Sequence, residues 1–314
     1  MKEIKSGIWK YILPFMFLLI FVILMGKGNM VSHLSQPRRQ LNVFVSILPQ
    51  KYFVERISGD KVKVSVMVGP GQNPATYEPL PKQMVALTEA NLYFRIGVPF
   101  ESIWIKKIQS LNPQLKMVDT RGGIPLRKIE GSHNHYELEP GSKHEDNSLH
   151  EDKEVKDPHI WLDPLFVRIQ AETICRELSA ADPENKAFYE RNLREFQDDL
   201  NQIHRELTET FQSLPVKKLM VFHPSWGYLA DRYGLKQIPI EIEGKEPGPR
   251  ELAKVIDQAR QEGIKVIFVQ SQFDTKAAES VARAVGGKVV PLDPLAEDYM
   301  NNLRRIATVI KKEL

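Results

Sequence analysis

The sequence predicts an α/β protein built from two α/β lobes with mainly parallel sheets, joined by one long rigid helix. Apolar strands alternate with helices before residue 130 and again after residue 215, which is the order of parallel sheets with helices on their faces. Between these parts, apolar residues recur at spacings of three and four over residues 183–214, as in a single helix. The 314 residues also correspond to about two domains of ordinary size.

The first lobe is predicted over residues 41–182. Valines occupy every second position of 62–68, the pattern of a half-buried strand. The loop 69–74, rich in glycine and proline, follows this strand at its carboxyl end, where α/β folds bind ligands. We expect strands at 41–48, 61–68, 91–98 and 116–119, and helices at 50–57, 80–89, 100–109 and 165–180.

A histidine- and acid-rich segment, residues 130–156, interrupts the first lobe. Its few apolar residues cannot bury enough surface to order it, so we expect a mobile loop. Imidazoles beside carboxylates would capture zinc weakly and raise its concentration near a main site. The alternative is a solvated surface loop with no specific role. The histidines concerned are His133, His135, His144 and His150.

The long helix is predicted over residues 183–214, and at 1.5 Å per residue it would measure roughly 45 Å. That length favours a helix that bridges two lobes. A self-associating coiled coil is the alternative, but only a few heptads are present. The second lobe, residues 215–314, is expected to have strands at 218–222, 237–242, 266–270 and 288–292, helices at 225–233, 251–262 and 275–285, and a final helix to the C-terminus.

Residues 1–28 predict export. Four lysines and one glutamate there account for the whole net charge of +3, so the neutral remainder gives no electrostatic case for nucleic-acid binding. The apolar run 11–25 follows three of these lysines, as in a signal peptide. Because no cleavage site is clear, an N-terminal anchor is the alternative, and a periplasmic or other extracytoplasmic location is expected. The single cysteine, Cys175, lies in a helical pattern and is expected to be buried.

Three residues are candidate metal ligands: His159, His223 and Asp293. Each has a proline beside it and is expected in a loop next to a strand or helix end, where the stiff backbone would hold a ligand in place. Two imidazoles and a carboxylate suit zinc, manganese (Mn2+) or ferrous iron (Fe2+). The alternatives are histidines hydrogen-bonded in a turn or core, and Asp293 as the N-cap of the last helix.

At these residues the sequence resembles a known family, the metal-specific solute-binding proteins of ABC importers, which is the ZnuA- and TroA-like zinc and manganese group. The resemblance covers nearly the whole chain after residue 28. It rests on the stretches Thr76–Pro79, Ile96–Gly97 with Phe100–Glu101 and Trp104, Asp157–Pro164, Phe222–Tyr228 with Tyr233–Leu235, Gln272–Phe273 with Lys276–Glu279, and Leu292–Leu295.

The resemblance implies a TroA-like fold that binds zinc between its lobes, with His159 from the first lobe and His223 and Asp293 from the second. It also implies an ABC permease as partner, and we expect a monomer. The family's further histidine ligand is replaced here by Ala75, which leaves a coordination position open. Water, a loop histidine, Gln72 or Glu78 would fill it, unless the last two only hydrogen-bond the loop backbone.

Three other functions compete with a zinc receptor that serves an ABC permease. An open coordination position would suit a secreted metal-dependent hydrolase, but His-Glu-x-x-His, Gly-x-Ser-x-Gly and phosphate-loop motifs are absent. A metal sensor or adhesin would use the same fold without transport, and Ala75 suggests a receptor that has lost its metal. We predict the receptor, with no catalytic residues.

Overall fold

The computed structural model describes residues 40–131, 156–242 and 244–314. The predicted signal segment therefore lies outside the described residues, as do the four histidines of the acid-rich segment. Within the described ranges, no helix combines the length and apolar character needed to cross a bilayer.

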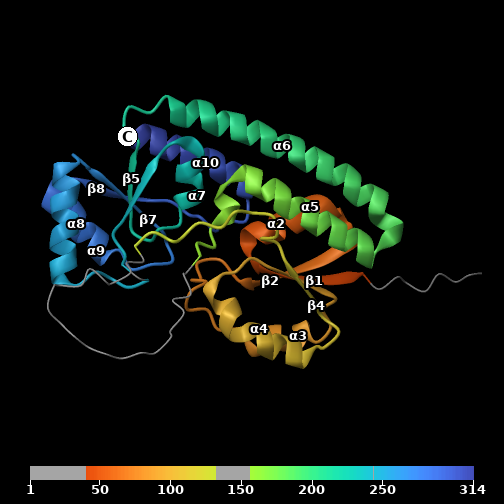
Figure 1. Cartoon of the computed structure of the whole chain (residues 1–314). Coiled ribbons are helices and arrows are strands. Elements are labelled where there is room, and N and C mark those ends of the chain that lie inside the picture. Colours follow the sequence, from red (N-terminus) through yellow and green to blue (C-terminus); the bar gives the residue numbers. More distant parts are fainter. Residues whose placement is uncertain (1–39, 132–155, 243) are drawn as a thin grey trace, which may run out of the picture. The chain divides into compact units, whose positions relative to one another are not determined.

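The first sheet contains four parallel strands in the order β2-β1-β3-β4 (Figure 1). All four predicted strands are confirmed, but the third ends before the predicted residue 98 because Gly97 turns the chain with φ +89°. The strands are β1 (Leu41–Ile47), β2 (Val62–Val68), β3 (Leu92–Arg95) and β4 (Lys116–Asp119); the helices of this lobe are α2 (Leu48–Ser58), α3 (Pro81–Leu87), α4 (Pro99–Leu111) and α5 (Pro164–Ala181).

The second sheet repeats this topology, with four parallel strands in the order β6-β5-β7-β8. The second of its predicted strands is shorter than expected, since β6 ends at Pro239 and not at Ile242. The strands are β5 (Lys218–Val221), β6 (Lys236–Pro239), β7 (Val266–Val269) and β8 (Lys288–Pro291); the helices are α7 (Gly227–Tyr233), α8 (Pro249–Gln261), α9 (Lys276–Val285) and α10 (Tyr299–Glu313).

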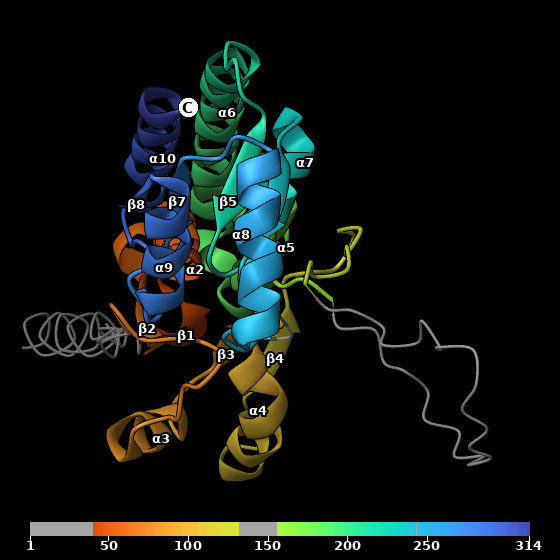
Figure 2. The ribbon, with the colours of Figure 1, turned by 90° about the vertical axis from the view of Figure 1, so that its left-hand side faces the viewer.

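Helix α6 (Lys186–Gln212) is the predicted long helix, and a 3-10 turn, Pro183–Asn185, precedes it. It packs against α2 and α5 of the first lobe and against α10 of the second. Figures 1 and 2 both show α6 and α10 side by side. The apolar side chains that predicted the helix pack against other elements of the same chain, so this face of α6 is not available to pair with a second copy in a coiled coil. Those fully buried are Phe196, Leu200, Ile203, Leu207 and Phe211.

Two apolar cores hold the sheets. The larger core continues from the first sheet through α6 to residues of β5 and α10. The smaller core lies between the second sheet and helices α8 and α9. The structure therefore confirms the α/β class, the two parallel sheets and the bridging helix. The exact limits of the two lobes stay a prediction, because the larger core crosses them.

Strand order places the site. In each sheet the first strand lies between the second and the third, so the strand order reverses beside it. Folds of this kind bind ligands at the carboxyl ends of the strands where the order reverses. His223 follows β5 by two residues, at such a point. His159 is the N-cap of a 3-10 turn, Ile160–Leu162, that leads into α5.

Candidate metal centre

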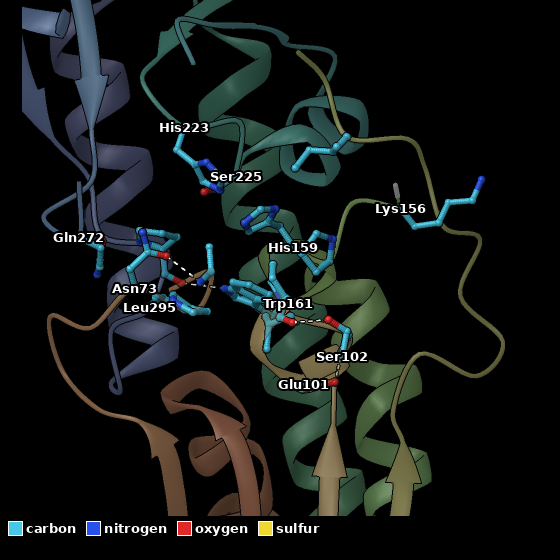
Figure 3. A pocket seen from close by; sticks show the side chains of 18 of the residues that line it. Asn73, Glu101, Ser102, Lys156, His159, Trp161, His223, Ser225, Gln272 and Leu295 are labelled. Atoms are coloured by element: carbon cyan, nitrogen blue, oxygen red, sulfur yellow. Dashed lines mark hydrogen bonds between the residues drawn. The ribbon is translucent and has the colours of Figure 1, made fainter. Parts of the chain in front are cut away.

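A cavity of about 440 Å³ receives side chains from both lobes. Ala75 and Glu101 come from the first lobe, and Gln272 and Leu295 come from the second. Both candidate histidines line it as well, and Figure 3 shows their rings on facing segments.

His159 is fixed by Asp157. Oδ1 of Asp157 accepts the backbone N–H of His159 at 2.9 Å and lies 2.7 Å from its Nδ1. The Asp157 side chain is fully buried, and the ring of Trp161 lies 5.1 Å from the imidazole, centre to centre. Because a carboxylate accepts, Nδ1 carries the proton, and Nε2 keeps the lone pair that binds metals.

His223 is fixed in the same way by Glu241. Nδ1 lies 2.6 Å from Oε2 of the buried Glu241, and the ring stacks on Phe273 with centres 4.5 Å apart. Burial lowers the pKa of His223 below its ordinary value and His159 adds to this, whereas Glu241 opposes it. The imidazole is therefore neutral near pH 7, which is the form that binds a metal ion.

The two histidine rings form a pair. Their centres are 5.2 Å apart and their planes meet at 70°. A carboxylate behind each ring fixes its tautomer, as it does for histidines that bind metals. The structure thus brings together two of the three predicted ligands.

Asp293 does not join this pair. Its Oδ1 accepts the Gln272 side-chain amide at 3.1 Å and the Leu295 backbone N–H at 2.9 Å. In the described part of the chain, no three histidine, cysteine or acidic side chains form a group able to hold a metal ion. Asp293 as third ligand stays a prediction. It is not the N-cap of the last helix, since α10 follows Asp298.

The loop that carries Asp293 is nevertheless fastened to the His159 turn. The indole N–H of Trp161 donates to the carbonyl of Pro294 at 2.7 Å, and the Tyr299 hydroxyl donates to the carbonyl of Trp161 at 2.8 Å. The Asn302 side chain donates to the Asp293 carbonyl at 2.7 Å. The first two of these bonds tie the turn that carries His159 to the segment that follows Asp293.

The predicted supplementary ligands differ in their positions. Ala75 lines the cavity, whereas the exposed Gln72 and Glu78 do not. The Gln72 side-chain oxygen accepts the Gly69 backbone N–H at 2.7 Å, which is the hydrogen bonding within the loop that was the alternative. The histidines His133, His135, His144 and His150 lie outside the described residues. Cys175 is buried, and burial raises the pKa of its thiol.

Sequence reasoning assigned no role to Asp157, Glu241 or Phe273. A signal for Glu241 exists in the pairing of two parallel strands: Val221 of β5 lies opposite Pro239 of β6. His223 and Glu241 each follow by two residues, so they leave the sheet side by side. The predicted strand 237–242 hid this, because it placed Glu241 inside the strand.

The chain was compared with known families and proteins. The family model described as zinc-uptake complex component A, periplasmic (ZnuA) matches residues 43–313. The high-affinity zinc uptake system protein ZnuA of Bacillus subtilis is 27% identical over 279 residues, which are 88% of this chain and 85% of that protein. The manganese ABC transporter substrate-binding lipoprotein PsaA of Streptococcus mitis is 29% identical over 239 residues, covering 73% and 72% of the two chains.

Solved structures give the same result. A crystal structure of ZnuA is 42% identical with a TM-score of 0.79, covering 87% of this chain and 98% of the other. A zinc-bound ZnuA with residues 138–173 of its own numbering deleted is also 42% identical, with a TM-score of 0.77 and coverage of 87% and 97%.

Proposed function

Since the chain belongs to the family of ZnuA, the periplasmic component A of zinc-uptake complexes, we propose that it captures zinc outside the cytoplasm and delivers it to an ABC permease. The family consists of metal-binding receptors of ABC importers and not of enzymes, so the hydrolase alternative is excluded. The relatives' names include both zinc and manganese, and the choice of zinc is therefore part of the proposal.

The observation that carries the proposal is the spacing of the two imidazoles. A zinc ion lies roughly 2.0–2.1 Å from an imidazole nitrogen, and hence about 3.2 Å from the ring centre. Two rings with centres 5.2 Å apart would subtend roughly 110° at a shared ion, which is close to the tetrahedral angle that zinc prefers. Neutral nitrogen donors also favour zinc over manganese, which is better suited by oxygen donors.

We propose that Asp293 completes the set when the ion binds. Its carboxylate lies in a loop fastened to the His159 turn through Trp161, and we expect it to exchange its bond with Gln272 for the ion. With Ala75 in the remaining position, water is the fourth ligand. The coordination position occupied by this water would then be accessible from the cavity.

Metal content tests the function. The protein is stripped with a chelator, dialysed against equal zinc and manganese, and measured by elemental analysis. One zinc per chain, retained in the presence of excess manganese, is expected. Manganese at one per chain would overturn the choice of metal, and the absence of any bound metal would identify the chain as a receptor that has lost its cargo.

Ala75→His is expected to tighten zinc binding. The new imidazole would replace a water ligand from a position that lines the cavity, and we expect at least about tenfold tighter binding, or about 1.4 kcal/mol. Competition against a chromophoric zinc chelator measures it. Lys82→His, on the exposed face of α3, controls for an added surface histidine. Unchanged affinity in Ala75→His would show that position 75 does not face the ion.

The acid-rich segment is proposed to supply zinc to the main site by weak capture. Deleting residues 132–152 is expected to leave one zinc tightly bound per chain, but to lower the number of weakly bound ions and to slow uptake when zinc is scarce. Stoichiometry and growth under zinc limitation are the two measurements. If neither changes, the segment has no role in metal capture.

Location and partner complete the proposal. The apolar run 11–25 directs export and is either cleaved or retained as an anchor, and the exported protein acts as a monomer on its permease. Fractionation of cells, with the mass of the mature N-terminus, tests the location. Growth under zinc limitation tests the partnership. Deletion of the receptor or of the permease should each impair growth, and deletion of both should impair it no further.

A further inference from the structure

Asp157 uses only one carboxylate oxygen to hold His159. Oδ1 receives both contacts from the histidine, whereas Oδ2 is buried and has no hydrogen-bond partner among the described residues. Burying a carboxylate costs free energy unless a positive charge or hydrogen bonds compensate for the lost water. Nη1 of Arg127 lies 3.8 Å from Oδ2, and it too is buried without a hydrogen-bond partner in the described chain. The two unpartnered atoms therefore face each other.

The Arg127 guanidinium is held there by contacts from both lobes. Nη2 donates to Glu130 at 2.5 Å, and Nε lies 3.2 Å from Asp231 of α7. The Arg127 carbonyl accepts the Asp157 backbone N–H at 3.0 Å. The Tyr228 hydroxyl, also on α7, accepts the Arg127 backbone N–H and donates to the Asp157 carbonyl. The backbone and the side chain of Arg127 are thus both tied to the residue behind His159.

Gly227 makes this position available. A Cβ at residue 227 would lie 1.5 Å from Nη1 of Arg127 and 2.9 Å from Oδ2 of Asp157. Any other residue at this first position of α7 would displace the guanidinium from the carboxylate. The absence of a side chain at residue 227 is thus what leaves room for the guanidinium beside Asp157.

We propose that Arg127 is a positioning residue of the metal site, whose guanidinium holds the Asp157 carboxylate in place behind Nδ1 of His159. The histidine then presents the lone pair of Nε2 to the ion. This inference rests on the proposed function in so far as His159 binds the metal. Because Asp231 and Gly227 belong to α7, the donor strength of a first-lobe histidine depends on a helix of the second lobe.

Arg127→Gln tests the role directly, with zinc as the probe. We expect about tenfold weaker binding, at the lower end of the 10–100-fold loss seen when partners of a metal-binding histidine are removed. Gly227→Ala should give a similar loss by pushing the guanidinium away. The double variant should lose little more than either single variant, because both remove one interaction.

Arg232→Gln is the matched control. Arg232 lines the same groove as Arg127 and pairs with Asp163 at 2.7 Å, which also links α7 to the first lobe, but this carboxylate is not the one bonded to His159. Its loss should lower stability and leave zinc affinity within about twofold of the wild type. Arg127→Lys restores the charge without the planar group, and should recover part of the affinity lost in Arg127→Gln.

The tautomer of His159 in the metal-free protein gives a readout that a purely structural role would not change. Long-range ¹H–¹⁵N spectra should show the proton on Nδ1 in the wild type and a mixture of tautomers in Arg127→Gln. An unchanged tautomer and affinity in Arg127→Gln, or equal losses in Arg127→Gln and Arg232→Gln, would overturn the inference. If the wild type binds no zinc, the proposed function fails, but the spectra still decide the role of Arg127.

Discussion

His223→Ala is expected to reduce zinc affinity by more than about 100-fold, because it removes one of the two imidazoles that we propose share the ion. This exceeds the 10–100-fold loss expected for Glu241→Gln, which weakens only the hydrogen bond behind the ring. Competition with a chromophoric chelator measures both losses. His204→Ala is the matched control, since His204 lies on α6 beside Tyr233 and away from the cavity.

The stability of the metal-free protein must be measured with these affinities. His223→Ala also removes a ring stacked on Phe273 and leaves the buried Glu241 without its partner. Urea unfolding of the metal-free variant therefore separates lost stability from lost coordination. Retention of wild-type affinity by His223→Ala would remove the basis of the proposed site, whatever the stability.

Trp161→Ala is expected to destabilise the protein by about 3–5 kcal/mol, the range for removing a large buried aromatic side chain. Trp161 is 1% exposed and its indole N–H donates to the Pro294 carbonyl. Its loss leaves a cavity and a carbonyl without its donor. Equilibrium unfolding in urea gives the change in the free energy of unfolding.

Two further variants separate the causes. Trp104→Ala removes the same side chain from a partly exposed position on α4, and it should cost much less. Trp161→Phe keeps most of the apolar volume but loses the N–H donor. We expect it to lower the free energy of unfolding by about 1–3 kcal/mol, the cost of leaving the Pro294 carbonyl unpaired. If Trp161→Ala is no more destabilised than Trp104→Ala, the bond between the His159 turn and the Asp293 loop contributes little.

Much of the fold could be predicted because its signals are local. Valine at alternate positions predicted β2, and the helix predicted at 165–180 is α5, whose N-cap Asp163 accepts the Leu165 N–H. The apolar spacing that predicted α6 arises because one face of this helix is buried. Each of these patterns repeats within one element, so no knowledge of distant contacts is needed.

The site was less predictable because its geometry depends on contacts between distant segments. Sequence reasoning selected His159 and His223 as ligands, and the structure brings them together. It did not find Glu241, whose role depends on the end of β6 and its register with β5. Nor could it give the hydrogen bond between Asp293 and Gln272, since side-chain direction in a loop is set by tertiary packing.

The hydrogen bonds of Trp161 with Pro294 and Tyr299 also have a consequence for biosynthesis. They join the turn that carries His159 to residues 133 and 138 positions further along the chain, so the turn lacks these partners until that later segment has been made. A nascent chain, or one threaded unfolded through a translocation channel, has no assembled site. The proposed competence to bind an ion is therefore acquired only after both segments have been made and have folded together.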